Sequence, residues 1–187
     1  MKKMTVFSLS ALMLFGALGV SAQKSDSDDA TYMLLATKRT GTMQKEISEA
    51  ADLGYRILMG SPTSGDEMAL FMQKVATKDA PYEYKLLATT RTGTMQKELN
   101  EIADQGFRLL PSTMIAKKQT LGGVEIVALM ERPHKIQKKY EYKLLATTRT
   151  STLQKEVLDA QAAGFVIVGM VSRGEHMVIV ERESAAN

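Results

Sequence analysis

The chain has no cysteine, and its 187 residues include only two histidines and four prolines. Without cysteine there is no disulfide, no thiolate metal site and no cysteine nucleophile. An excess of one charge is also missing, because Lys2 and Lys3 account for most of the difference between 24 basic and 21 acidic residues. Nucleic-acid binding needs a clustered positive face, so we predict none.

Long apolar segments are confined to the N-terminus. Lys2 and Lys3 precede an apolar run over residues 4–20, and Val20, Ser21 and Ala22 are small. This pattern is typical of a cleavable secretory signal, and the run is too short for a stable membrane span of about 20 residues. We therefore predict a signal peptide over 1–22 and an exported protein, periplasmic or secreted, with no stable membrane span after cleavage. The polar, acidic residues 23–29 are predicted to form a flexible leader.

One stretch of the sequence occurs almost unchanged twice. "YEYKLLATTRTGTMQKE" at 82–98 returns at 140–156 with only Gly93 replaced by Ser151 and Met95 by Leu153. A weaker match begins at Tyr32, which indicates a tandem array. We predict repeat 1 over 30–76, repeat 2 over 82–133 and repeat 3 over 140–183. The repeats differ in length only after their shared glycine, which places the variation in one loop.

Each repeat changes its hydrophobic period along its length. The segment "YKLLATTRT" is rich in β-branched residues and predicts a strand. Apolar residues then fall on one helix face, with Gln161 in repeat 3 the one polar exception. The glycine at position 41, the glycine at 93 and the serine at 151 suit an N-cap, followed by a glutamine three residues later as in a capping box. The helix is predicted to end at Gly54, Gly106 and Gly164, before an aromatic residue that opens a β-hairpin.

These elements define an α+β fold of three tandem β-α-β-β repeats with one helix each. A right-handed crossover makes the first two strands parallel, and the hairpin places the third strand between them. The predicted sheet order is 1-3-2, half of a ferredoxin-like unit. One helix covers one sheet face, and the apolar third strands, such as residues 128–130, fit burial on both faces. We therefore expect the repeats to pack together through their sheets.

The segments "YEYKLL", "LNEIADQGFRLLPS" and "EIVALMER" of repeat 2 resemble a bacterial family of short domains, the domain of unknown function 4177 family. The resemblance covers each repeat almost end to end and rests on structural motifs. Members commonly have one copy and a Gly-Trp pair where this chain has Gly-Tyr or Gly-Phe. The resemblance implies a fold and no catalytic residue.

An Arg-Thr-x-Thr motif recurs where the first strand passes into the helix. Free N–H groups at a helix N-terminus, hydroxyls and a guanidinium together suit a small anion. Two lysines of the repeat 2 hairpin are expected at the same end, so Arg91 is expected to matter most. The tentative ligand-binding residues are Arg39, Thr40, Thr42, Arg91, Thr92, Thr94, Arg149, Thr150, Thr152, Lys117 and Lys118. The alternative is that the threonines cap the helix and each arginine is solvated or pairs with Glu46, Glu98 or Glu156.

Other chemistry has weaker support in the sequence. Met43 and Met95 lie on the predicted buried helix face, and His134 and His176 lie in different repeats, so we predict no metal site and no cofactor. No Ser-His-Asp set is indicated. We predict a non-enzymatic binding or interaction module whose partner is another exported protein or a small anion. The alternatives are an anion binder that uses the Arg-Thr motifs and an enzyme of unrecognised type.

Overall fold

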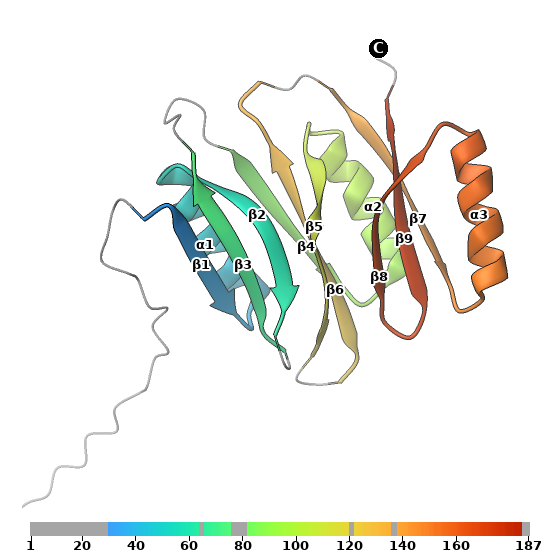
Figure 1. Ribbon diagram of the computed structural model, residues 1–187, viewed down its shortest axis with the longest axis horizontal. Helices are drawn as coiled ribbons and strands as arrows, with labels where there is room; N and C mark the ends of the chain where they lie inside the picture. Colours follow the sequence, from blue (N-terminus) through green and yellow to red (C-terminus); the bar gives the residue numbers. More distant parts are fainter. Residues whose placement is uncertain (1–29, 64–65, 76–81, 120–121, 136–137, 185–187) are drawn as a thin grey trace, which may run out of the picture.

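The computed structural model describes residues 30–63, 66–75, 82–119, 122–135 and 138–184. The predicted signal peptide and leader lie outside these residues. The described elements follow one another as three β-α-β-β repeats (Figure 1).

The repeats have the following elements. Repeat 1 contains β1 (Tyr32–Thr37), α1 (Thr40–Asp52), β2 (Tyr55–Pro62) and β3 (Met68–Lys74). Repeat 2 contains β4 (Glu83–Thr89), α2 (Thr92–Ala103), β5 (Arg108–Lys118) and β6 (Val124–Arg132). Repeat 3 contains β7 (Tyr140–Thr147), α3 (Thr150–Ala162), β8 (Val166–Ser172) and β9 (His176–Glu183).

Each repeat forms its own three-stranded sheet. The strand orders are β1-β3-β2, β4-β6-β5 and β7-β9-β8, and the third strand of each repeat is antiparallel to both neighbours. The predicted α+β class, the 1-3-2 order and the single helix per repeat are therefore confirmed. In repeat 1, Leu34, Phe71 and Met59 form one row across the three strands. The equivalent row of repeat 2 is Leu86, Leu129 and Leu110.

The repeats stack as alternating layers of sheet and helix, from the sheet of repeat 1 to α3 (Figure 1). Helix α1 contacts its own β1 and also β4 of repeat 2, and α2 contacts both β4 and β7. Where the helices leave the sheets uncovered, β2 packs on β5 and β5 packs on β8. The predicted packing of repeats through their sheets is thus confirmed, with a helix inserted in each interface.

Burial of the third strands follows from this stacking. In β6, Val127 and Leu129 join the core around α1, whereas Ile126, Ala128 and Met130 join the core around α2. Strand β9 is likewise buried on both faces. The prediction fails for β3, because no repeat among the described residues covers the outer face of its sheet and Phe71 stays exposed.

The helix boundaries correct one prediction and confirm another. The N-caps are Arg39, Arg91 and Arg149, two residues earlier than predicted, and no side chain caps any of the three helices. The capping box is therefore wrong. The shared glycines do end the helices: Gly54, Gly106 and Gly164 have φ of 87°, 88° and 84°, the left-handed region that favours glycine.

Length variation is not confined to a loop. Part of the extra sequence in repeat 2 lies within β5, where the register with β6 shifts between Leu110 and Ile115. Thr113 is buried in this bulge, donating its hydroxyl proton to the Leu110 carbonyl (2.7 Å) and accepting from the Leu129 N–H (3.1 Å). The Ser112 hydroxyl donates to the Leu58 carbonyl of repeat 1 at 2.8 Å. The insertion therefore fills part of an interface between repeats.

Candidate functional site

The residues with the most specific contacts lie between the repeats. Gln44 of α1 holds the first strand of repeat 2 through its side-chain amide. Its Nε2 donates to the Tyr84 carbonyl at 3.1 Å, and its Oε1 accepts from the Leu86 N–H at 2.7 Å. The glutamine of the rejected capping box thus extends the hydrogen bonding of a strand in the next repeat.

Gln96 repeats this contact one interface further along. It bonds the Tyr142 carbonyl at 2.7 Å and the Leu144 N–H at 2.6 Å. Asn100, one helical turn later, adds a pair of bonds to the N–H and carbonyl of Tyr142 at 2.9 and 3.0 Å. The equivalent residue at the first interface is Ser48, whose hydroxyl donates to the Gln44 carbonyl of its own helix.

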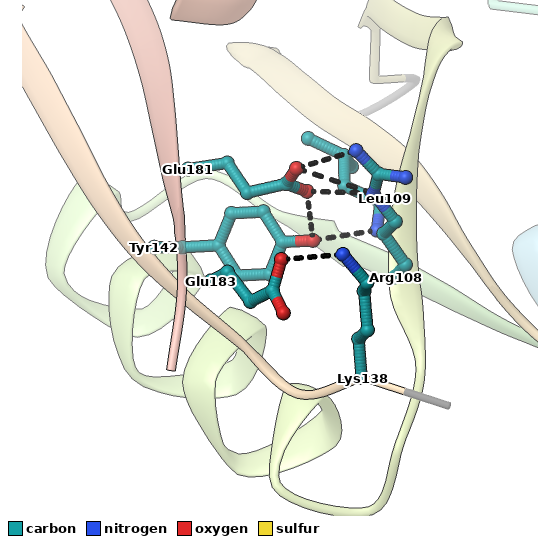
Figure 2. Close-up of polar contacts among 6 residues, drawn as sticks. All are labelled: Arg108, Leu109, Lys138, Tyr142, Glu181 and Glu183. Carbon is teal, nitrogen blue, oxygen red and sulfur yellow. Dashed lines mark hydrogen bonds and ion pairs between the residues drawn. The ribbon is translucent and has the colours of Figure 1, made fainter. Parts of the chain in front are cut away.

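A tyrosine, a glutamate and an arginine form a second set of contacts at each interface. The buried Tyr142 hydroxyl donates to Glu181 at 2.7 Å and accepts from the Leu109 N–H of repeat 2 at 2.9 Å. Arg108 of repeat 2 pairs with the same carboxylate at 2.7 Å (Figure 2). At the first interface Tyr84, Glu131 and Arg56 make the equivalent contacts.

Burial and charge set the protonation of these groups. Burial, reinforced by the neighbouring glutamate, raises the pKa of the Tyr84 and Tyr142 hydroxyls far above their ordinary value. The hydrogen bond to its glutamate is the largest cause that raises the pKa of each arginine, Arg56 and Arg108. Both hydroxyls therefore stay protonated and donate to a carboxylate across the neutral range.

An open groove of about 560 Å³ runs past both networks. Arg56 stacks over Tyr82 and Arg108 over Tyr140, with guanidinium to ring distances of 4.3 and 4.4 Å. Lys138 on the groove wall pairs with Glu183 at 2.7 Å (Figure 2). Arg56, Arg108 and Lys138 are thus each matched by a carboxylate, and these three pairs join elements along the groove.

The predicted anion-binding residues occupy the helix starts but do not converge on one site. Arg39, Arg91 and Arg149 are exposed, and the backbone N–H of each donates to the hydroxyl of the threonine two residues earlier, at 3.1 to 3.3 Å. Thr40, Thr42, Thr94, Thr150 and Thr152 lie in the first turns of their helices.

The start of α2 is occupied by the hairpin of repeat 3. Arg173 donates to the Thr90 carbonyl and to the Thr92 hydroxyl, the latter at 2.7 Å. The Thr92 hydroxyl in turn donates to Glu175 at 3.2 Å. The chain itself therefore supplies a carboxylate beside this helix N-terminus.

The two lysines proposed for the second helix start lie elsewhere. Lys117 is buried, pairs with Glu125 at 3.1 Å and donates to the Lys38 carbonyl at 3.3 Å, which places it at the start of α1. Lys118 is exposed at the end of β5. In the described part of the chain, no hairpin of a following repeat lies at the start of α3.

Sequence reasoning missed the interface residues. A signal was present, because arginine follows the Gly-aromatic pair in repeats 1 and 2, while valine stands there in repeat 3. The facing glutamate is present in repeats 2 and 3 and is Gln73 in repeat 1. Each charge therefore occurs only where the chain supplies its partner.

The described ranges contain no group of three or more His, Asp or Glu residues placed to hold a metal ion. No helix within them is long and apolar enough to cross a membrane.

Comparison with known proteins gave no relatives: no family model, no curated protein and no solved structure matches the chain. The resemblance to the domain of unknown function 4177 family stays a prediction.

Proposed function

We propose that this protein is an exported, non-enzymatic interaction module in which three stacked repeats form a scaffold with two binding ends. The distribution of exposed apolar side chains supports this function. Ten large hydrophobic residues are exposed in the described part of the chain, and all lie in repeats 1 and 3. They are Tyr32, Leu34, Leu53, Leu58, Met59, Phe71, Leu158, Val166, Ile167 and Met170.

Two clusters account for most of these residues. The sheet end consists of Tyr32, Leu34, Met59 and Phe71 on the uncovered sheet of repeat 1. The helix end consists of Leu158 on α3 with Val166, Ile167 and Met170 on β8. Stacked-repeat proteins need polar outer faces on their terminal repeats to stay apart in solution. Apolar ends are instead typical of surfaces that another protein covers.

Footprinting by hydrogen exchange or hydroxyl radicals tests the proposal. The protein is compared in its native cell extract and after purification and dilution. We expect protection of both the sheet end and the helix end in the extract, with Leu53 as an exposed apolar control outside both. If each end is labelled to the same extent in the extract as in dilute solution, the result would contradict an interaction function.

A further inference from the structure

We propose that the helix end of one chain binds the sheet end of a second copy of the same chain, in the geometry that joins successive repeats. This inference rests on the proposed function and specifies its partner. The stacking within the chain indicates the partner of the sheet end. At both internal interfaces, the sheet of one repeat is covered by the preceding repeat.

The sheet end is the surface that a preceding repeat covers elsewhere in the chain. Tyr32 is 56% exposed, whereas its equivalents Tyr84 and Tyr142 are 5% and 1% exposed beneath repeats 1 and 2. Likewise the row of Leu34, Phe71 and Met59 is exposed, while the equivalent row of repeat 2 packs against repeat 1. Repeat 1 therefore presents a complete receiving face with no repeat on it.

The helix end is the surface that a following repeat covers. Ile167 is 58% exposed, whereas the equivalent Ile57 and Leu109 are 5% and 2% exposed. Helix α3 covers mainly the β7 side of its sheet and leaves β8 exposed. The equivalent strands β2 and β5 are covered by the next repeat. Repeat 3 therefore presents the complementary docking face.

Two of the polar groups that align the internal interfaces are present, a glutamine at the helix end and a tyrosine at the sheet end. Gln154 holds the position of Gln44 and Gln96 and is exposed on α3. Tyr32 supplies the backbone carbonyl that such a glutamine binds. Its hydroxyl has the position that, at the internal interfaces, contacts the strand after the helix of the preceding repeat. An incoming repeat 3 would thus bond the Tyr32 carbonyl and the Leu34 N–H through Gln154.

The ion pair of the internal interfaces has no counterpart at either end. Val166 stands where Arg56 and Arg108 stand, and Gln73 stands where Glu131 and Glu181 stand. A charge on only one end would be buried without a partner on association, which is strongly unfavourable. Because both are neutral, the two ends suit each other.

Leu158 extends this match. It stands at the repeat position that Ser48 and Asn100 occupy in α1 and α2, so the helix end is more apolar than the internal surfaces of those helices. The sheet end is apolar as well, which makes the pairing of these two faces the contact that buries most exposed hydrophobic residues.

An interface between two different faces does not close on itself after one step. Unless the rotation between copies forms a ring, it generates open chains of molecules. We therefore expect an assembly that grows with protein concentration past the dimer.

Sedimentation velocity of the purified protein tests this assembly. The weight-average mass of the wild type should rise with concentration beyond that of a dimer. Ile167→Asp blocks the helix end and Phe71→Asp blocks the sheet end, so each variant alone should stay monomeric. Mixed together, they should form a one-to-one dimer that grows no further, because each retains the face that the other lacks.

A charge rescue tests the geometry. Gln73→Glu should weaken association by placing an unpaired carboxylate in the contact. Adding Val166→Arg should restore the association by recreating the internal ion pair between copies. Leu53→Asp is the matched control, an exposed apolar residue at the α1 C-cap that should leave association unchanged. Thermal melts of every variant establish that the fold is retained.

The outcomes separate the two proposals. A wild type that stays monomeric, an association that survives Phe71→Asp, or no dimer in the mixture would overturn the self-association. If the wild type is monomeric but both ends are protected in the native extract, another protein is the partner and the interaction function stands. If the ends are unprotected in both settings, both proposals fail.

Discussion

Replacing Tyr142 by phenylalanine removes one hydroxyl from the centre of the second interface. That hydroxyl lies in a side chain that is 1% exposed, donates to Glu181 at 2.7 Å and accepts from the Leu109 N–H at 2.9 Å. Phenylalanine keeps the ring and its packing. The variant therefore isolates the two hydrogen bonds.

The expected cost follows from these two bonds. A hydrogen bond to a charged group contributes about 1.5–3 kcal/mol, and a buried N–H left without an acceptor costs about 1–3 kcal/mol. The same hydroxyl makes both bonds and the surrounding groups can relax after its removal, so the two costs do not add in full. We expect the free energy of unfolding to fall by about 2–3 kcal/mol. For a chain of this length, that lowers the melting temperature by about 4–12 °C.

Tyr32 provides a control at the same position of the repeat. Its side chain is exposed, so Tyr32→Phe should change stability by less than about 0.5 kcal/mol. Both variants are measured by chemical denaturation at a concentration where the protein is monomeric, since Tyr32 lies at the sheet end. Equal effects of Tyr142→Phe and Tyr32→Phe would refute the role assigned to the hydroxyl.

Four further predictions test the fold and the helix starts. Gly106→Val should cost about 1 kcal/mol or more, since φ of 88° suits glycine, and an unchanged melting temperature would contradict this. A fragment of residues 82–133 should be unfolded or self-associated, because both faces of its sheet unit lose their neighbours; a cooperatively folding monomer by sedimentation would show otherwise. Above pH 10.0 the free energy of unfolding should fall as pH rises, because tyrosines ionise in the unfolded chain while Tyr142 keeps its proton when folded; denaturation of the Tyr84→Phe/Tyr142→Phe variant should show a weaker fall, and an equal slope would count against it. If helix starts bind anions, phosphate at 100 times its dissociation constant should stabilise the fold by about 2.7 kcal/mol, and Arg149→Gln should remove most of that effect; no phosphate response in thermal melts of the wild type would end the hypothesis.

The last prediction moves the main anion site from Arg91 to Arg149. Sequence reasoning favoured Arg91 because the repeat 2 hairpin carries Lys117 and Lys118. In the structure Lys117 contacts the start of α1, and Glu175 lies beside the start of α2. A hairpin therefore reaches the preceding repeat, which the pattern within one repeat could not predict.

The fold itself was predictable because local rules determine it. The 3.6-residue period, the glycine after each helix and the handedness of the crossover leave one sheet order for each repeat. The capping box failed for the opposite reason. A glutamine near a helix start has the same sequence pattern whether it caps its own helix or, as Gln44 does, binds Leu86 of another repeat.

The interface network was hidden from the sequence because its members come from two repeats. Arg108, Tyr142 and Glu181 are separated by tens of residues, and none belongs to a recognised motif. The one link between them in the sequence is which repeats contain the arginine and which contain the glutamate. Arginine is present in the repeats that another repeat follows, and glutamate in the repeats that another repeat precedes.

Duplication accounts for the likeness of repeats 2 and 3 but not for the positions at which the repeats differ. Both receive a preceding repeat, and both keep the Tyr-Glu-Tyr segment that contributes Tyr84 and Tyr142 to an interface. Within the described residues no repeat packs on the outer sheet face of repeat 1, which has Gln73 in place of the glutamate, and none packs beyond repeat 3, which has Val166 in place of the arginine. Tyr32 and Gln154 nevertheless remain at ends where the chain supplies no partner for them. The proposed contact between molecules would use both of these residues, the Tyr32 carbonyl as acceptor and the Gln154 side chain as donor.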